Sequence, residues 1–234
     1  MKRLFFPTYI AYNFYNIYNL TMPANYDNSA WFYDRLSRLV YGDVLMRAQV
    51  YLLQFIPANA KLLLVGGGTG WILEDLGRVR PSGLKIVYVE VSSKMIAKAQ
   101  KKDTGGNEVI FINSAVENTT LAAGFDVVMT PFLFDSFSDQ TVDKVFGHIH
   151  TLLKPGGLWL YADFRPAKKW WQHFLLTSML AFFRAICNIE SMRLPDVDSR
   201  FKRHGYEIFA QQSFFRDFLT SVAYRKHNMQ ALPL

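Results

Sequence analysis

The sequence predicts an α/β fold, built as a doubly wound, mostly parallel seven-stranded sheet with helices on both faces and a C-terminal antiparallel hairpin. Two observations favour this class. Apolar runs bounded by turn residues recur along the chain, and most are continuous rather than alternating, which is typical of strands covered on both faces. Helical patterns lie between these runs at short spacing, and such an alternation indicates a doubly wound sheet.

The individual elements follow from the apolar runs and the turn residues that bound them. Helices are predicted where apolar periodicity follows a turn, and the last of them ends before the turn KPGG. Parallel strands are predicted at 61–65, 85–91, 108–113, 125–130 and 157–164, and helices at 71–79, 93–102 and 140–153.

The two ends of the sequence carry different patterns. Segments 206–214 and 218–226 are separated by too few residues for a crossover helix, so we expect them to pair as an antiparallel hairpin at the sheet edge. Residues 30–57 read as two amphipathic helices broken at Gly42. The basic opening segment contains Pro7 and several asparagines and lacks a cleavage site, so it is not read as a signal peptide.

Composition narrows the functional classes. Cys187 is the only cysteine of the 234 residues, which excludes an internal disulfide and favours a reducing, cytoplasmic compartment. The formal charge of +7 also suits plain solubility, so it is only a weak argument for a nucleic-acid partner, which the sequence does not favour. The longest apolar stretch, 174–189, contains Arg184 and falls short of the roughly 20 residues that a bilayer span needs. No set of metal ligands is recognised.

A glycine-rich turn follows the first predicted strand. Gly66, Gly67, Gly68 and Gly70 lie between the strand and the next helix, where a bare main chain can approach a ligand and the helix offers free N–H groups. A P-loop would need Lys and then Ser or Thr after the last glycine, and a dinucleotide fingerprint would need glycine at Trp71. The pattern therefore predicts a different nucleotide-type site, at the carboxyl end of the strand.

At these residues the sequence resembles the class I S-adenosylmethionine-dependent methyltransferases, which have a Rossmann-like fold. The likeness rests on LLLVGGGTG, on Glu90 in YVEVSS, on KPGGLWLYADF and on YDRLSRLVYG, and it covers roughly residues 25–226. Glu90 lies 20 residues beyond Gly70 (90 − 70), the spacing at which a carboxylate accepts hydrogen bonds from ribose hydroxyls. The resemblance implies S-adenosyl-L-methionine as cofactor and methyl transfer as activity.

The resemblance also implies further cofactor contacts by position. One departure is Leu64, where the family usually has an acidic residue. This departure keeps a non-catalytic partner or sensor protein as an alternative. Besides the four glycines and Glu90, the expected contacts are Val91, Met95, Asn113, Ser114, Ala115, Thr130, Pro131 and Tyr41.

The acceptor side gives fewer signals. Approximation and desolvation supply much of the rate of methyl transfer, so no catalytic residue is required; Asp135 and Tyr33 are the candidates, with Asp163 and His148 also considered. Methylation of a nucleic-acid base is less favoured. Enzymes that methylate base amino groups have Asp or Asn, Pro, Pro and an aromatic residue at this place, and TPFL lacks the acid or amide and the second proline. The expected acceptor contacts are Phe132, Phe134, Trp170 and Trp171.

The expected organisation is an arm at 1–24, mobile or a leader, and one methyltransferase domain at 25–234. Within it we expect a helical lid at 25–56 and an acceptor-side helical insertion at 166–205, whose apolar face at 168–189 packs internally, binds a lipophilic acceptor or contacts a membrane surface. The leading hypothesis is a cytoplasmic enzyme that methylates a small hydrophobic or aromatic molecule. RNA or protein is the alternative acceptor, and the sequence indicates neither acceptor atom nor oligomeric state.

Overall fold

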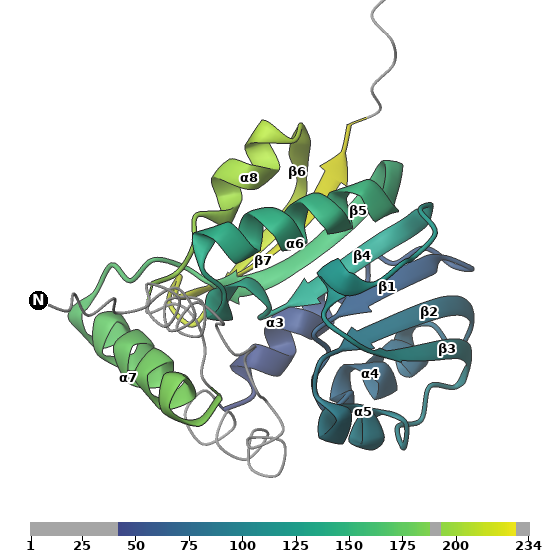
Figure 1. The fold of residues 1–234 in the computed structure, drawn as a ribbon, viewed down its shortest axis with the longest axis horizontal. Helices are drawn as coiled ribbons and strands as arrows, with labels where there is room; N and C mark the ends of the chain where they lie inside the picture. The colour runs from purple at the N-terminus through teal and green to yellow at the C-terminus, as the bar shows by residue number, and fades with distance from the viewer. Residues whose placement is uncertain (1–41, 188–192, 228–234) are drawn as a thin grey trace, which may run out of the picture.

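A computed structural model describes residues 42–187 and 193–227 of the chain (Figure 1). Its seven strands form one sheet in the order β3-β2-β1-β4-β5-β7-β6, which confirms the predicted fold class. The first five strands are parallel, and β7 pairs antiparallel with both β5 and β6. The strands are β1 Lys61–Val65, β2 Ser82–Glu90, β3 Gly106–Asn113, β4 Phe125–Pro131, β5 Leu153–Phe164, β6 Tyr206–Phe214 and β7 Leu219–Lys226.

The helices pack on both faces of the sheet. In Figure 1, α6 and α8 lie in front of the sheet, and α3 lies behind it. The α4 helix has the predicted bounds, whereas α5 ends three residues earlier than predicted. The helices are α3 Val44–Leu53, α4 Trp71–Val79, α5 Ser93–Ala99, α6 Asp139–Leu152, α7 Trp170–Cys187 and α8 Val197–Arg203, with short 3-10 turns η2 Val116–Asn118 and η3 Phe134–Ser136.

The central strands are buried on both faces, as their continuous apolar runs predict. In β1, Leu63 and Val65 belong to the core beneath α6 and α8, whereas Leu62 and Leu64 belong to the core beneath α3 and α4. Successive side chains of a strand point to opposite faces, so both cores draw on the same five-residue run. Leu64 is fully buried in the second of these cores.

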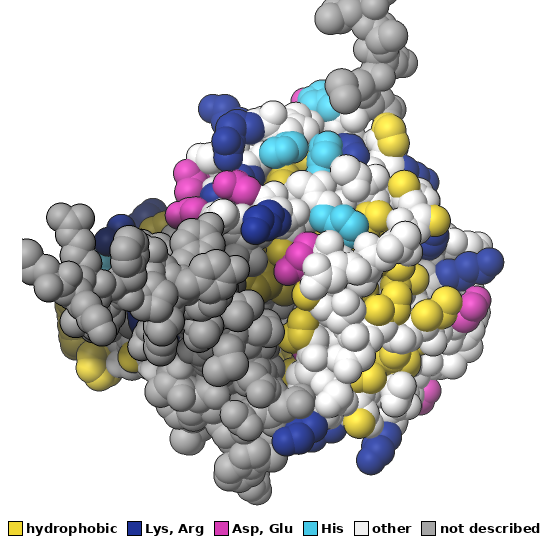
Figure 2. Space-filling view, in the orientation of Figure 1, with side chains coloured by type: hydrophobic (Ala, Val, Ile, Leu, Met, Phe, Trp, Pro, Cys, Tyr) yellow, Lys and Arg dark blue, Asp and Glu magenta, His cyan; other side chains and the backbone are white. Residues whose placement is uncertain are grey.

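The β3 strand differs from this expectation. Its burial alternates along the chain, and Ile110 is 52% exposed, so the prediction of a strand covered on both faces is wrong here. The reason is the connection from β3 to β4, which contains only the short turn η2 and no α-helix. Figure 2 shows hydrophobic side chains on the right of the molecule, over β2 and β3.

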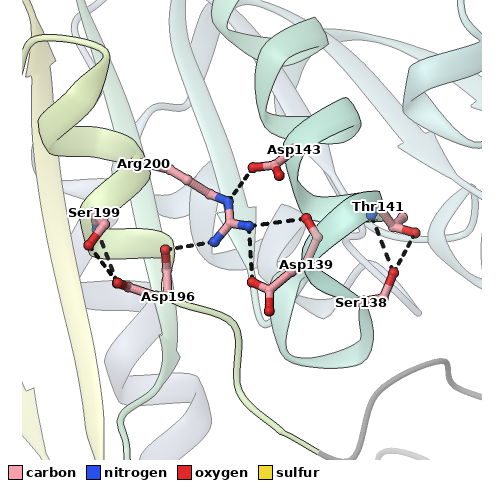
Figure 3. A network of polar contacts seen from close by, with 7 residues as sticks. All are labelled: Ser138, Asp139, Thr141, Asp143, Asp196, Ser199 and Arg200. Atoms are coloured by element: carbon pink, nitrogen blue, oxygen red, sulfur yellow. Dashed lines mark hydrogen bonds and ion pairs between the residues drawn. The ribbon is translucent and has the colours of Figure 1, made fainter.

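A polar network attaches α8 to the first turn of α6 (Figure 3). The Arg200 guanidinium donates to Asp143 Oδ1 at 2.7 Å and to Asp139 Oδ1 at 2.9 Å, and it also reaches the Asp196 carbonyl at 2.8 Å. Arg200 is buried, while the two carboxylates of α6 remain largely exposed. Arg200 thus fixes the insertion that precedes the hairpin against the N-terminal part of α6.

The expected lid and insertion are covered only in part. The α3 helix lies within 25–56, and the rest of the lid up to residue 41, like the arm at 1–24, lies outside the described residues. The insertion at 166–205 contains α7 and α8. Within the described ranges, every helix is too short or too polar to cross a bilayer.

Candidate cofactor and acceptor site

The carboxyl ends of the parallel strands bring the predicted site residues to one edge of the sheet. Chain order reverses between β1 and β4, since β2 and β3 lie on one side of β1 and β5 on the other. In doubly wound sheets ligands bind at such a switch point, outside the carboxyl ends of the strands. Val65, Glu90 and Pro131 end three of the strands there.

The glycine loop begins directly at this point. The Gly66 amide donates to the carbonyl of Val89 at 2.9 Å, which continues the pairing of β1 with β2 into the loop. Gly66, Gly68 and Gly70 have φ of 70°, 62° and 76°, in the left-handed region that favours glycine. The loop conformation therefore explains three of the four glycines.

The glycines of this loop differ in whether protein atoms or open space surround them. A Cβ at Gly67 would lie 2.5 Å from the Tyr88 ring, and one at Gly70 would lie 2.5 Å from Ala99 Cβ. Gly68 differs, because its nearest neighbour would be Met95 Sδ at 3.9 Å. The protein fills the space beside Gly67 and Gly70, whereas the space beside Gly68 is open to a ligand.

Glu90 is held against this open position. Its side chain is only 6% exposed; Oε2 accepts from the Gly68 amide at 3.1 Å and Oε1 accepts from the Ser92 amide at 2.9 Å. Carboxylate oxygens have two lone pairs each, so a carboxylate at this position can accept from sugar hydroxyls as well as from amides. The geometry therefore fits an adenosine-bearing cofactor.

Tyr88 supports the same loop and was missed by the sequence reading. Its hydroxyl donates to the Gly68 carbonyl at 2.9 Å, so Gly68 is held through its N–H by Glu90 and through its C=O by Tyr88. The signal was available, because residues two apart on a strand share a face and Tyr88 precedes Glu90 by two.

The residues expected near the adenine lie around the ends of β2 and β3. Asn113 Nδ2 donates to the carbonyls of Glu90 and Val91 at 2.9 and 2.8 Å, which leaves its Oδ1 as an acceptor. Val91 is 44% exposed, whereas Met95 is buried. Ser114 Oγ donates to the adjacent Ala115 carbonyl, and both residues are half-buried. Asn113 thus joins the ends of the two strands.

Thr130 near the end of β4 and Phe134 in the turn after it lie in the core instead of facing the site. Thr130 is fully buried, and its hydroxyl accepts from Trp159 Nε1 at 2.9 Å, so its side chain faces the core and not the cofactor that it was expected to contact. Phe134 is also fully buried, packed against Phe146 and Tyr161, which removes it from the residues that can touch an acceptor in this structure.

Phe132 lies between these two residues in a strained conformation. Its φ is 49°, which is uncommon for a residue with a Cβ, and its amide donates to the Ala162 carbonyl at 2.7 Å. The preceding Pro131 is buried. The half-buried Phe132 ring packs against Phe164, with 5.5 Å between ring centroids.

The two tryptophans of α7 have different surroundings. Trp171 packs against Phe215 and Phe218 at 5.4 and 5.9 Å between centroids, whereas Trp170 is 81% exposed. Adjacent helix residues point about 100° apart, so only one of the pair can face the sheet. The structure therefore brings Trp171 to the apolar cluster that contains Phe132, and it does not bring Trp170 there.

Gln172 anchors the first turn of α7 and was also missed. This buried side chain accepts from the amides of Lys168 and Lys169 at 2.8 and 3.0 Å through Oε1, and its Nε2 donates to the Arg216 carbonyl at 3.2 Å. A glutamine inside an apolar pattern gives no local signal for this contact, since its partner lies 44 residues away.

Two aspartates lie beside the loop that follows β4. Burial raises the pKa of Asp135, and burial together with the charge of Asp135 raises the pKa of Asp163 well above its ordinary value. The other candidates, Tyr33 and Tyr41, lie outside the described residues. The described part of the chain contains no cluster of three or more His, Cys, Asp or Glu side chains that could hold a metal ion.

A hollow of about 260 Å³ lies elsewhere on the surface. It is lined by α4 residues, among them Glu74 and Gly77, and by Asp103 and Gly105 of the loop before β3. The α4 helix runs back from the glycine loop, so its last turn lies toward the opposite edge of the sheet. This hollow therefore does not belong to the candidate site.

Comparison with known proteins agrees with this geometry. Residues 62–157 match the family described as Methyltransferase domain. Over 197 residues the chain is 26% identical to an uncharacterized methyltransferase of Geobacillus kaustophilus (strain HTA426). This alignment covers 82% of this chain and 88% of that protein. The matched family segment runs from β1 to the turn before the buried part of β5, so it contains the glycine loop and Glu90.

Solved structures share the fold at low identity. The magnesium protoporphyrin IX methyltransferase of Synechocystis PCC 6803, with bound SAH, matches at 16% identity and a TM-score of 0.61, over 86% of this chain and 96% of that one. A mitomycin 7-O-methyltransferase matches at 17% identity and a TM-score of 0.59, over 82% of this chain but only 56% of that one. These structures show the shared fold, while the family match over residues 62–157, the methyltransferase relative and the glycine loop support a class I S-adenosylmethionine (SAM)-dependent methyltransferase.

Proposed function

We propose that the acceptor is a small hydrophobic or aromatic molecule that binds beside Phe132, between the end of β4 and the first turns of α7. The observation that carries this proposal is the left-handed backbone of Phe132, with φ of 49°. Such a conformation costs about 1–2 kcal/mol for a residue with a Cβ, and strain of this kind concentrates at functional sites. Here it places an aromatic ring at the carboxyl edge of the sheet, against Phe164.

The surroundings of Phe132 support an apolar acceptor. Phe164, Phe218 and Leu219 form a small buried cluster, and half-buried side chains of α7, including Leu175 and Leu176, pack against it together with Phe132. The sequence has no acidic residue from Arg165 through Ile189. Small-molecule sites are lined mainly by apolar and aromatic side chains, so this wall suits an acceptor of the same character.

The residues that we propose to hold SAM lie on the other side of the switch point. The main chain at Gly68 and the carboxylate of Glu90 would take the ribose, and Val91, Asn113 and Ala115 would border the adenine. SAM supplies an electrophilic methyl group when bound. The chain contributes by binding and orienting both reactants and by excluding water with the apolar cluster around Phe132, since approximation and desolvation supply much of the rate.

Two similar structures lend support by their names, which give mitomycin and magnesium protoporphyrin IX as the molecules methylated by those proteins. RNA or protein remains the second candidate acceptor, favoured by the formal charge of +7. An RNA site would need a positive stripe beside Phe132, whereas this ring packs against the apolar cluster of Phe164, Phe218 and Leu219.

The test is transfer of a labelled methyl group from SAM to a metabolite extract, with RNA and protein fractions assayed in parallel. We expect label in a small, organic-extractable product, and a Phe132→Ala variant that transfers about tenfold less while it still binds SAM. Phe209→Ala is the matched control, because this ring is 48% exposed on β6 and packs against Phe55 instead. Label in RNA or protein alone would contradict the proposal.

A further inference from the structure

The α7 helix buries one face and exposes the opposite one. Its inward side chains, among them Trp171, Leu175 and Leu176, pack against the small buried cluster at the end of β5. Trp170 and Phe174 share the outward face, because residues four apart in a helix lie one above the other. At 81% and 67% exposed, they are the most exposed large hydrophobic side chains among the described residues. Two such rings side by side indicate an interaction surface.

Contacts on the other side of the helix fix the outward direction of Trp170. Gln172 is buried, accepts from two backbone amides of the preceding turn and donates to the turn after β6. Trp171 packs against Phe215 and Phe218. Adjacent helix residues point about 100° apart, so a rotation that buried Trp170 would expose Trp171 and break the hydrogen bonds of Gln172. The packing of α7 therefore requires the exposed position of Trp170.

Positive charge flanks the exposed pair of rings. Lys168 and Lys169 directly precede Trp170 and are exposed, and Arg184 is exposed further along the helix. The ion pairs found among the described residues include neither lysine. The sequence has no acidic residue from 165 through 189. This face of α7 thus combines large apolar rings with cations alone.

The neighbouring segment leaves this balance unchanged. Gln172 donates to the Arg216 carbonyl at 3.2 Å, which brings the turn between β6 and β7 beside the first turn of α7. That turn adds one exposed cation and one exposed anion, Arg216 and Asp217. In Figure 1, α7 lies at the left of the molecule, away from β2 and β3 at the right. The surface around Trp170 therefore stays positive in sum.

We propose that this face, formed by Trp170 and Phe174 with Lys168 and Lys169, docks onto the surface of an anionic lipid bilayer. Aromatic rings of this kind enter the boundary between headgroups and acyl chains, while neighbouring lysines are attracted to anionic headgroups. Lysine stems are apolar, so they can lie along the same boundary with their charges in water. The helix lies along the membrane surface in this arrangement.

Other occupants fit the same face less well. Surfaces that bind single-stranded nucleic acid combine a charged groove with stacking rings, whereas these rings stand on the convex side of one helix with the lysines at one end. A second copy of the chain would bring one positive helix face against another, because a twofold contact uses the same patch on both subunits. Like charges across an interface oppose association. Charge complementarity therefore favours an anionic lipid surface.

The inference goes beyond the proposed function and does not depend on it. The inward side of the same turns packs against the cluster that also contacts Phe132, the ring beside which we place the acceptor. A lipophilic acceptor dissolved in a bilayer would therefore meet the protein next to its proposed site.

The first test is cosedimentation of the full chain with vesicles of equimolar phosphatidylglycerol and phosphatidylcholine. We expect binding that weakens as salt is raised and that is lost on phosphatidylcholine alone. Lys168→Gln with Lys169→Gln should lower the partition coefficient by on the order of tenfold. Lys101→Gln with Lys202→Gln is the matched control, because both lysines are exposed elsewhere on the molecule, and it should change the coefficient by less than about twofold.

The aromatic side chains are tested separately. Trp170→Ala and Phe174→Ala should each lower the partition coefficient by about tenfold, since each ring leaves water on binding. Ile208→Ala is the control, because Ile208 is 59% exposed on β6 and lies outside this face, and it should bind as the unaltered chain does. Equal Tm values would show that all variants fold. Failure to bind anionic vesicles, or binding that both aromatic variants retain in full, would overturn the proposal.

A second measurement locates the ring in the bilayer. Lipids with brominated acyl chains quench tryptophan fluorescence at the acyl boundary, so they should quench the unaltered chain strongly and the Trp170→Phe variant much less. Trp71→Phe is the control, because Trp71 begins α4 beside the glycine loop, and it should keep the quenching. Equal quenching in the unaltered chain and in Trp170→Phe would overturn the assigned contact.

Two further outcomes would replace the membrane by another partner. A dimer in sedimentation velocity that Trp170→Ala dissociates would assign the face to a second copy of the chain. Retention on single-stranded RNA in place of vesicles would assign it to nucleic acid. These measurements need neither SAM nor an acceptor, so their failure is distinguishable from failure of the labelled transfer that tests the proposed function.

Discussion

Two buried acidic residues at the same edge of the sheet, Glu90 at the end of β2 and Asp163 near the end of β5, have opposite surroundings. Their exposed fractions are similar, 6% and 2%. Both oxygens of Glu90 accept backbone amides, whereas Asp163 has one oxygen without a partner among the described residues. The comparison teaches that partners, more than depth of burial, decide whether an enclosed carboxyl group can carry a charge.

The difference originates in the connections that follow each strand. After β2 the chain turns at once into α5, and the Ser92 amide of that turn points back at Glu90 while the glycine loop supplies a second amide. After β4 the chain enters η3, where the Phe134 ring packs against Tyr161 and the Phe134 and Asp135 amides face the Asp163 carboxyl group, while Oδ2 has no hydrogen-bond partner among the described residues. The turn after β2 and the glycine loop thus supply hydrogen bonds to Glu90, whereas the aromatic ring of Phe134 helps to enclose Asp163.

The largest effect is expected from breaking the well-partnered side. Glu90→Gln replaces the carboxylate that accepts from the Gly68 amide and, in our assignment, from the ribose hydroxyls. We expect SAM affinity to fall by on the order of 1.5–3 kcal/mol, the range for hydrogen bonds to charged groups, measured by calorimetry. Glu74→Gln is the control, because Glu74 on α4 pairs with Lys102 at 3.2 Å. Unchanged affinity in the Glu90 variant would show that the ribose assignment is wrong.

The loop beside Glu90 can be tested through its packing. Gly67→Ala would place a Cβ 2.5 Å from the fully buried Tyr88 ring, so we expect a loss of about 1–3 kcal/mol in the free energy of unfolding. Gly147→Ala in α6 is the matched control, since its Cβ would meet nothing within 4 Å and a helical alanine should stabilise by about 0.5–1 kcal/mol. Denaturant unfolding distinguishes the two, and equal stability would contradict the packing argument.

The β5 side depends on α8, which Arg200 holds in place. Arg200→Ala removes the contacts to Asp139, Asp143 and the Asp196 carbonyl, and we expect the free energy of unfolding to fall by about 1–2 kcal/mol. The loss is limited because the Asp139 and Asp143 carboxylates are already largely exposed and remain hydrated without Arg200. Arg225→Ala, which removes an exposed guanidinium over the Phe209 ring, should cost less than half as much. A larger loss in the control would reverse this ranking.

The smallest effect concerns pH at the far end of α6. Burial, with the charges of Lys226 and His204, lowers the pKa of His150 to about 4. The unfolded chain then binds the proton first, so stability that is present above about pH 6.5 is lost as pH falls toward 4.

Because His150 is partly exposed, we expect a change of only about 1 kcal/mol over this range. The measurement is Tm against pH. His150→Gln should flatten the curve and His148→Gln on the same helix should not. If the Tm curves of both variants ran parallel to that of the unaltered protein, His150 would be excluded as the source of the pH dependence.

Sequence reasoning succeeded where the pattern is local. The run KLLLV and the helix that starts at Trp71 have the bounds that apolar periodicity predicts, and the hairpin lies at the sheet edge as the short 206–226 spacing requires. Glu90 lies at the glycine loop because two strand ends and one spacing rule place it there. These features depend on residues that are close in sequence.

It failed where a side chain depends on distant partners. Thr130 turns inward because Trp159 offers its indole N–H, and Trp170 faces outward because the phase of α7 is fixed by Gln172 and the turn after β6. Ile110 stays exposed because the connection to β4 lacks a helix, which an apolar run alone does not reveal. Apolar periodicity indicates that a residue belongs to a helix or strand. It does not determine whether a side chain near the end of that element points to the core or to solvent.

The place of β7 in the sheet has a consequence for how the chain folds. This strand follows β6 in sequence but lies between β5 and β6, and its Ser221 hydroxyl donates to the Ala48 carbonyl at 2.6 Å, 173 positions earlier. During synthesis, β6 can join the sheet only after residue 226 has left the ribosome, and until then β5 is an open edge. A nascent chain halted before residue 219 would therefore be exposed to aggregation and to quality control.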